Sequence, residues 1–500
     1  MQQSHNRSIA HGVGWMLLFK LLERTLGILS TLVLVRLLVP ADFGVVAMAQ
    51  SFIVMVQLLG ALGFDVALIR DQSASEDHYH TAWTLNAGLG LLITVIMLSL
   101  ASPIASFYGK PELYAVVCAL ALVSFFSGLE NIGVVAFRKE LRFRNEFAFQ
   151  LSRKLVGIAV ALPLAFVLRS YWALVAGTLA SCLAGTLISY LAHPFRPRLS
   201  LAKAAELLDF SRWLLVGNII GFVRERSSDF FIGRLAGPAA LGAYNISYEI
   251  SNLPTTELSA PINRALMPGF SKIANDPAAL QQTYLQAFSL LVLLTVPAAV
   301  GILALADFLV PVLLGPKWLD AVPLIQLLAI TGIFQALQSS SATALIATGH
   351  PKSVFMTNAL YAVVLLVFLT LLAPSRGAIG AALATAAAAL TATPVFLLCL
   401  RGYVGIPFAQ IALHLWRPIC AAIAMLVAVL WFLPVYTPDI GTVSAAGYLA
   451  AGTLVGAAAY ASVLGFLWLL ADKPGGGEQI LLAQLRAAIV RLSSQTPRAR

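Results

Sequence analysis

The feature that most constrains the fold of this chain is the recurrence of apolar runs of about 20 residues along almost its whole length. Hydrophobic residues make up 59% of the 500 residues and charged residues only 11%, whereas an average soluble domain has roughly 25% charged residues. The mean hydropathy is +0.87. Because a helix of about 20 apolar residues crosses the hydrocarbon core of a bilayer, the sequence predicts an all-α polytopic membrane protein and excludes a soluble enzyme.

We predict about fourteen transmembrane helices, and the Lys and Arg residues between them indicate the orientation. The expected spans are 11–38, 42–64, 81–107, 112–137, 147–168, 171–192, 211–237, 239–262, 286–306, 318–347, 352–373, 376–400, 412–433 and 442–470. The odd-numbered loops contain Lys110, Arg169, Lys317 and Arg376, whereas the termini and even-numbered loops contain most of the others. By the positive-inside rule both termini lie in the cytoplasm. The first apolar run is interrupted by Lys20, so we interpret it as a retained span rather than a signal peptide.

The chain repeats itself at an offset of 198 residues. The segment RLLVPADFG at 36–44 aligns with RLAGPAALG at 234–242, and Trp15, Ala67 and Leu68 have identical counterparts at the same offset. Six spans in each copy give parallel repeats, which are related by an axis along the membrane normal and place a binding site between the halves. We therefore predict a six-helix lobe at 1–200, a second at 201–400, two additional helices at 401–472 and a cytoplasmic tail at 473–500 whose residues 478–492 form an amphipathic helix.

Two charged triplets lie near the middle of two expected spans. Lys20, Glu23 and Arg24 share one face of the first helix, while Arg224, Glu225 and Arg226 lie in the seventh. Each charge at mid-membrane costs about 2.5–3.5 kcal/mol, so such residues face each other or a water-filled cavity. We predict a cationic cavity here.

Further acidic residues fall within the same or neighbouring spans, and we expect them to line the cavity. Asp229 shares a face with Arg226, Glu249 and Glu257 lie in the eighth span, and Glu130 lies in the fourth. Guanidinium groups bind phosphate oxygens in a bidentate manner, so Lys20, Arg24, Arg224 and Arg226 suit an anionic ligand such as a lipid-linked pyrophosphate. Glu23, Asp229, Glu249, Glu257 and Glu130 either pair with these cations or couple transport to an ion gradient.

Other functions are disfavoured by what the sequence lacks. It contains no phosphate-binding Gly-x-x-x-x-Gly-Lys-Ser/Thr loop and no His-Glu-x-x-His or paired cysteine spacing, so we expect no ATP hydrolysis, no metal and no cofactor beyond an ion gradient or the membrane potential. The four cysteines lie in apolar runs and are expected to act as small buried hydrophobic residues. The basic residues behind the net charge of +10 are distributed as the predicted membrane topology requires. We therefore expect them to contact anionic phospholipids rather than nucleic acid.

Several segments together resemble the polysaccharide transporter (Wzx-like) flippase family of the multidrug/oligosaccharidyl-lipid/polysaccharide superfamily, with greatest similarity to exporters of the colanic acid, succinoglycan and xanthan type. These segments are Gly14-Trp15, 36–44, 63–69, 209–211, 229–234, 241–245 and 264–271. The resemblance implies two six-helix lobes in a V shape, alternating access, and movement of an undecaprenyl-pyrophosphate-linked repeat unit from the cytoplasmic to the periplasmic leaflet. It also implies a place beside the polysaccharide polymerase and export machinery.

Three alternatives stay open. A drug/cation antiporter of the same superfamily would have an acidic, aromatic cavity, whereas this cavity is predicted to be basic. A membrane enzyme of glycan assembly, such as a polymerase or ligase, typically needs a long periplasmic loop, and the expected outer loops are short. A scaffold for the assembly complex would tolerate loss of the cavity charges.

Overall fold

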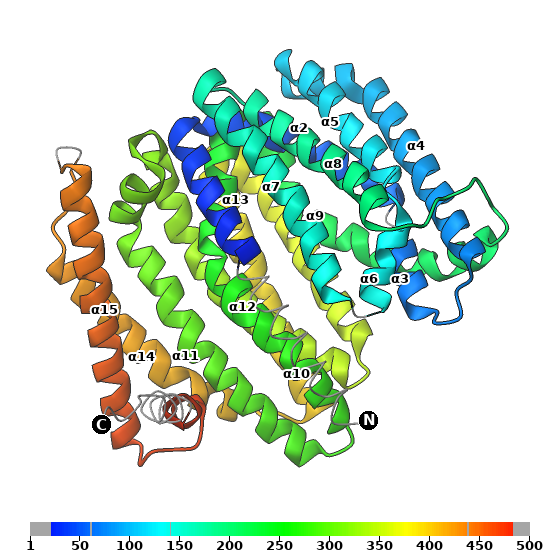
Figure 1. Cartoon of the computed structure of the whole chain (residues 1–500). Coiled ribbons are helices and arrows are strands. Elements are labelled where there is room, and N and C mark those ends of the chain that lie inside the picture. The colour runs from blue at the N-terminus through cyan, green and yellow to red at the C-terminus, as the bar shows by residue number, and fades with distance from the viewer. Residues whose placement is uncertain (1–21, 61–62, 141, 438–439, 484–500) are drawn as a thin grey trace, which may run out of the picture. The chain divides into compact units, whose positions relative to one another are not determined.

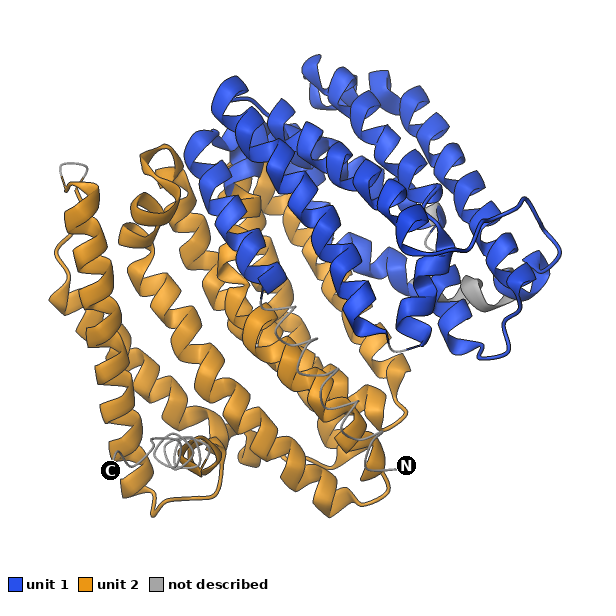
Figure 2. Ribbon diagram, viewed as in Figure 1, with its two compact units in different colours: residues 1–243 blue, residues 244–500 orange. Residues whose placement is uncertain are grey.

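The structure, a computed structural model, describes residues 22–60, 63–140, 142–437 and 440–483, apart from the side chains of 59 and 208–216. The described part is helical and contains no strand (Figure 1). It divides into two compact units, residues 1–243 and 244–500 (Figure 2). The sequence places the boundary between the two repeats at residue 200. This boundary stays a prediction, because a compact unit of the structure need not coincide with one copy of a sequence duplication.

Unit 1 begins with a helix over residues 22–37. It continues with α2 (Pro40–Gln57), α3 (Phe64–Arg70), α4 (Glu76–Tyr108), α5 (Glu112–Gly128), α6 (Val135–Lys139), α7 (Phe143–Leu168), α8 (Trp172–Ala192) and most of α9 (Ala204–Ser251). Single 3-10 turns follow α2 at Leu58–Gly60 and precede α6 at Ile132–Val134. Helix α5 packs against α4 and α8, and α8 packs against α7.

Unit 2 contains α10 (Ala260–Lys272), α11 (Pro277–Leu309), α12 (Val322–Ala347), α13 (Pro351–Val404), α14 (Phe408–Phe432) and α15 (Thr442–Leu470). A π-helical turn at Thr255–Ser259 precedes α10, another at Val310–Leu314 follows α11, and a 3-10 turn at Pro316–Ala321 precedes α12. Helix α12 packs between α11 and α13, and α14 and α15 pack together and against α11. Buried Phe270, Tyr284 and Phe288 lie in the largest cluster of this core.

Nine helices of the described residues are long and apolar enough to cross a membrane, or ten if the bent pair Glu112–Gly128 and Ile132–Lys139 forms one span. The 54 residues of α13 are too many for one crossing, because about 20 residues suffice. The backbone breaks at Gly377, which has φ 56° and ψ −130°. This break lies at the second residue of the span expected at 376–400, so the expected boundary after residue 373 is a few residues early. Helix α9 breaks in the same way at Gly237. The protein is therefore a multi-pass membrane protein, consistent with about fourteen spans.

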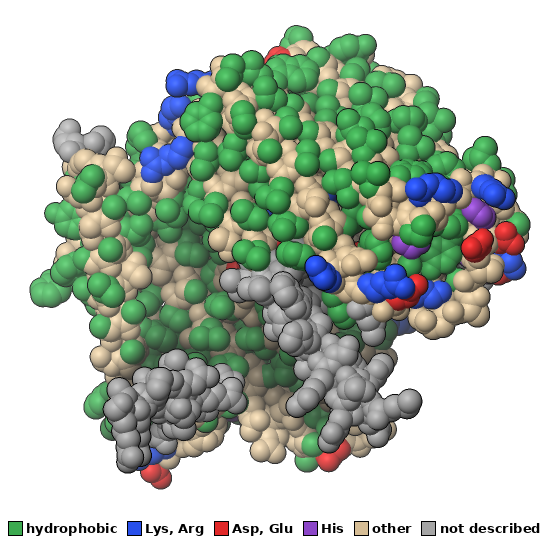
Figure 3. Space-filling model, viewed as in Figure 1, with side chains coloured by type: hydrophobic (Ala, Val, Ile, Leu, Met, Phe, Trp, Pro, Cys, Tyr) green, Lys and Arg blue, Asp and Glu red, His purple; other side chains and the backbone are tan. Residues whose placement is uncertain are grey.

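Hydrophobic side chains cover much of the face of the molecule drawn in Figure 3, as expected for contact with lipid. Charged side chains gather at the end of unit 1 that contains α3 and α6 (Figures 1 and 3). Arg138 of α6 lies 3.4 Å from Asp65 of α3 and 3.5 Å from Glu146 of α7, and these pairs fasten the helix ends together.

Candidate functional site

A buried carboxylate, Asp229 of α9, forms the centre of one polar group in unit 1. Its side chain is 2% exposed. Ser51 of α2 donates a hydrogen bond to Asp229 Oδ2 at 3.2 Å, and Arg226 Nη1 lies 3.3 Å from the same oxygen. The spacing of three residues places Arg226 and Asp229 on one face of α9, as the sequence predicts. The structure thus joins a cation and an anion from the expected cavity set and adds a hydroxyl from α2.

Aromatic rings adjoin this group. The ring of Phe52 lies 5.0 Å from that of Phe230 and 5.8 Å from that of Tyr108, with edge-to-face geometry. The Tyr108 hydroxyl is buried and has no hydrogen-bond partner among the residues that the structure describes. Gly233 brings α9 close to this wall, because a Cβ there would lie 2.7 Å from the Tyr108 ring. The rings limit access of water to Asp229, which strengthens its pairing with Arg226.

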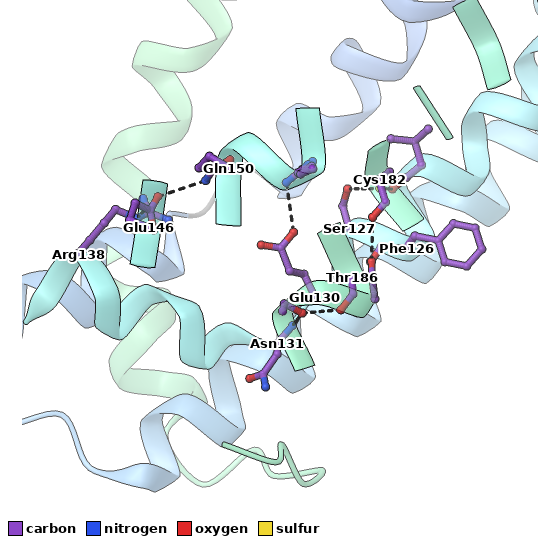
Figure 4. A network of polar contacts seen from close by, with 12 residues as sticks. Phe126, Ser127, Glu130, Asn131, Arg138, Glu146, Gln150, Cys182 and Thr186 are labelled. Atoms are coloured by element: carbon purple, nitrogen blue, oxygen red, sulfur yellow. Dashed lines mark hydrogen bonds and ion pairs between the residues drawn. The ribbon is translucent and has the colours of Figure 1, made fainter. Parts of the chain in front are cut away.

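Glu130 lies where the fourth expected span breaks. Helix α5 ends at Gly128, and the following helical segment is turned by 64°. Figure 4 shows Glu130 and the adjacent Asn131 at this break. The Asn131 side chain accepts a hydrogen bond from Gly133 N–H at 2.9 Å and donates one to the Phe195 carbonyl at 2.7 Å. These bonds satisfy backbone groups that the break releases. The sequence predicted a continuous span over 112–137, and the structure corrects this to a broken one.

Arg153 of α7 is the partner of Glu130. Its Nη1 atom lies 3.3 Å from Glu130 Oε2, and both side chains are about one-quarter exposed. Gly185 of α8 makes room for it, because a Cβ there would lie 3.0 Å from Arg153 Cδ. Helices α5, α7 and α8 together therefore position this ion pair.

Lys154, the next residue, reaches the first helix. Its Nζ atom donates a 2.6 Å hydrogen bond to the Glu23 carbonyl. Sequence reasoning missed both Arg153 and Lys154, although two adjacent cations inside the span expected at 147–168 could have been noted. Helix α7 thus adds two cations to the charged residues that the sequence predicts in the first and seventh spans.

The remaining predicted site residues are dispersed. Lys20 lies outside the described residues, and Arg24 and Arg224 are half-buried in unit 1. Glu249 and Glu257 have exposed side chains in unit 2, where Glu257 Oε1 accepts a hydrogen bond from Thr256 at 3.1 Å. The structure therefore brings together Arg226 with Asp229, and Glu130 with Arg153, but does not join the whole predicted set.

Metal and thiol chemistry receive no support within the described ranges. They contain no group of three His, Cys, Asp or Glu residues able to hold a metal ion. The four cysteines are free, and only Cys182 is buried. The expectation that all four are buried is wrong, because Cys420 lies on an exposed face of α14, which we expect to contact lipid. A buried carboxylate paired with a partly exposed guanidinium, as in Asp229 with Arg226, suits recognition of charged ligands or movement of ions.

The sequence is similar to those of known polysaccharide biosynthesis proteins. The lipopolysaccharide biosynthesis protein WzxC of Escherichia coli is 25% identical over 425 residues, which cover 83% of this chain and 86% of the relative. The succinoglycan biosynthesis transport protein ExoT of Rhizobium meliloti is 26% identical over 330 residues, covering 65% and 66%.

Two solved structures share the fold. The lipid II flippase MurJ in an inward closed conformation matches with a TM-score of 0.73 and 13% identity, over 90% of this chain and 98% of that one. A multidrug resistance transporter of the MATE family in an inward-facing conformation matches with a TM-score of 0.58 and 13% identity, over 77% and 94%. The sequence profile described as "Polysaccharide biosynthesis protein" matches residues 33–323, more than half of the chain, and the chain therefore belongs to this family.

Proposed function

We propose that this protein is a flippase that moves an undecaprenyl-pyrophosphate-linked oligosaccharide across the bacterial inner membrane by alternating access, for exopolysaccharide or lipopolysaccharide synthesis. The observation that carries the proposal is the set of charged groups held inside apolar helices, above all Asp229 with Arg226. Buried intramembrane charges are costly and mark pathways for substrates or ions. Membership of the polysaccharide biosynthesis family and the fold shared with a lipid II flippase support the same substrate class.

In this proposal the cations bind the pyrophosphate while the lipid tail stays in the bilayer. Lys20, Arg24, Arg224 and Arg226 are the predicted ligands, and we add Arg153 and Lys154 of α7. A pyrophosphate oxygen near Arg153 would compete with Glu130, and one near Arg226 would compete with Asp229. The carboxylates therefore hold the cations in place when the substrate is absent.

A carboxylate released in this way, Glu130 or Asp229, is an acceptor for a proton or a sodium ion and is a candidate for coupling. Glu23, Glu249 and Glu257 are further candidates from their positions in the expected spans. Both termini are assigned to the cytoplasm by the distribution of Lys and Arg. The basic end of unit 1 at α3 and α6 would contact anionic phospholipids, and the polysaccharide polymerase would receive the product.

The test is mass spectrometry of lipids from a deletion strain complemented with wild type, Arg226→Gln or Arg142→Gln. We expect the deletion and Arg226→Gln strains to accumulate the lipid-linked oligosaccharide and export no polymer, at normal protein abundance. Arg142 is an appropriate control because its side chain is 60% exposed and forms an ion pair with surface Glu140 at 2.7 Å. Unchanged lipid intermediates in the deletion strain would refute the flippase and favour the drug/cation antiporter.

A further inference from the structure

The duplicated segment noted in the sequence forms a contact with its own copy. Helix α2 begins at Pro40, and the part of α9 beyond the break begins at Pro238. The break is formed by Gly237, whose φ of 83° is accessible mainly to glycine. Each helix then carries a glycine four residues after its proline, Gly44 and Gly242.

These two glycines lie against each other's prolines. The Cβ position of Gly44 falls on the carbonyl of Pro238, with Pro238 Cα 2.8 Å away. The Cβ position of Gly242 falls on the carbonyl of Pro40, with Gly44 N 3.0 Å away. No side chain fits at either position, so the two backbones touch directly. We call this contact of Pro40, Gly44, Pro238 and Gly242 the clasp.

The clasp has the symmetry of the sequence repeat. Gly44 and Gly242 differ by 198 residues, as do Pro40 and Pro238, and this is the offset of the duplication. Exchanging the two copies therefore maps the contact onto itself, which is the property of a two-fold interface. For parallel repeats such an axis runs along the membrane normal. Both prolines lie in odd-numbered loops, which the Lys and Arg distribution predicts to face outside, so the clasp lies at the outer end of α2.

The two sides of the clasp are held differently. The start of α2 is fastened to α8, because Asp42 accepts hydrogen bonds from Val39 N–H at 3.0 Å and from Tyr171 N–H at 2.9 Å. The clasp itself joins Cα–H groups to carbonyl oxygens, which are weak interactions. The contact between the repeats is thus the weaker one, and it can open while α2 stays attached to α8.

We propose that the clasp is the outer seal between the two repeats and that it must part to release substrate outside. The proposal rests on the alternating access of the proposed function. The proposal gives the repeated Pro-x-x-x-Gly segment a function. Glycine is required there because the seal closes only where no side chain separates the two backbones. A Cβ at either glycine would keep the seal open.

The first experiment measures opening of the seal in cells. Gly44→Ala and Gly242→Ala are compared with Gly88→Ala, because a Cβ at Gly88 of α4 meets nothing within 4 Å. A cysteine at Ala47, one turn below Gly44, reports access of a membrane-impermeant thiol reagent from outside in a cysteine-free background. We expect labelling to rise about tenfold in both clasp variants and not in Gly88→Ala. Equal labelling in all three would overturn the proposal, provided that abundance is normal.

The second experiment decides between a seal that opens and a fixed pivot, and it does not require an alanine variant to fold. Cysteines at Ala41 and Ala239, the residues after the two prolines, are joined with a short cleavable bis-maleimide. We expect polymer export to stop on crosslinking and to return on cleavage. The control pair Val429→Cys and Gly456→Cys joins α14 to α15, where the Cβ position of Gly456 lies 3.0 Å from Val429 Cγ2. We expect export through this control to continue.

Continued export through the crosslinked clasp would show that it is a static pivot and would refute the seal. The labelling assay needs no knowledge of the substrate. Failure of the clasp is therefore distinguishable from failure of the flippase assignment, which lipid analysis tests separately.

Discussion

Removing one charge of the buried pair Arg417–Glu478 tests how the tail is attached to unit 2. Arg417 of α14 and Glu478, just beyond the glycine-rich segment 475–477, are 3% and 5% exposed, and Arg417 Nη1 lies 2.7 Å from Glu478 Oε1. Glu478→Gln leaves the guanidinium buried without its counter-charge. Breaking such a pair from one side costs about 3–5 kcal/mol.

The neighbouring contacts hold the tail in position, so it cannot easily move to relieve the cost. Gly477 N–H donates a 2.9 Å hydrogen bond to Ser289 Oγ of α11, and a Cβ at Gly477 would lie 2.6 Å from Leu290 N. Trp468 Nε1–H also donates to the Pro474 carbonyl at 3.3 Å. Since a unit of 150–250 residues loses about 2–4 °C in Tm per kcal/mol, we expect Glu478→Gln to lower Tm by roughly 6–20 °C.

The assay is thermal unfolding of the detergent-purified protein, followed by size-exclusion chromatography. Lys473→Gln is the matched control, because it removes an exposed charge from the same segment. The double variant Arg417→Gln with Glu478→Gln should recover most of the loss, because no uncompensated charge is left. A Tm for Glu478→Gln equal to that of Lys473→Gln would refute the reasoning.

Three further perturbations have defined outcomes. Asp229→Asn removes the charge that positions Arg226, so we expect export to fall at least about tenfold at normal abundance, measured as polymer per cell. Glu130→Gln frees Arg153, and we expect tighter binding of a soluble pyrophosphate to the purified protein, measured by calorimetry; unchanged affinity would exclude Arg153 from the ligand set. Burial lowers the pKa of His193, whose Nδ1 accepts a 3.2 Å hydrogen bond from Phe195 N–H. The contribution of the neutral His193 imidazole to stability is therefore present above the ordinary pKa of about 6.5 and is lost as the pH falls below it. Thermal unfolding at pH 7.5 and 5.5 should show this loss, and His193→Gln should reduce the difference.

The sequence was sufficient to predict the properties that depend on amino-acid composition and on the spacing of apolar residues. Apolar runs separated by Pro and Gly located the helices. The break at Gly237 falls on the last residue of the span expected at 211–237, and the break at Gly377 falls on the second residue of the span expected at 376–400. Both breaks have positive φ, a conformation that glycine adopts readily, so the local signal and the tertiary structure agree. The repeat at 36–44 was also visible, although its contact with 234–242 was not.

The properties that the sequence did not reveal depend on pairing across the bundle. The helical period predicts on which face of its helix Glu130 lies. Nothing in residues 128–132 identifies Arg153 as the partner of Glu130. The tail provides a second example. We expected residues 478–492 to form an amphipathic helix on the cytoplasmic surface, and of these residues 484–492 lie outside the described part of the chain. Within the described part, Glu478 is buried and paired with Arg417 of α14. The apolar period of the tail gave no sign of this partner, which lies far earlier in the sequence.

The charged groups that the structure pairs lie mainly at breaks or crossings of helices, and this location has a physical cause. A continuous apolar helix satisfies its own backbone and presents only side chains, so it gives an ion no fixed polar surroundings. At the break after Gly128, Asn131 satisfies the released backbone and Glu130 turns toward Arg153. At the close approach of α9 to α2, Ser51 reaches Asp229. If transport uses these groups, variants that straighten a break should fail even when every charge is kept. Asn131→Leu removes the cap while retaining Glu130 and Arg153, and we expect it to lose export with both charges present; wild-type export by this variant would show that the break serves packing alone.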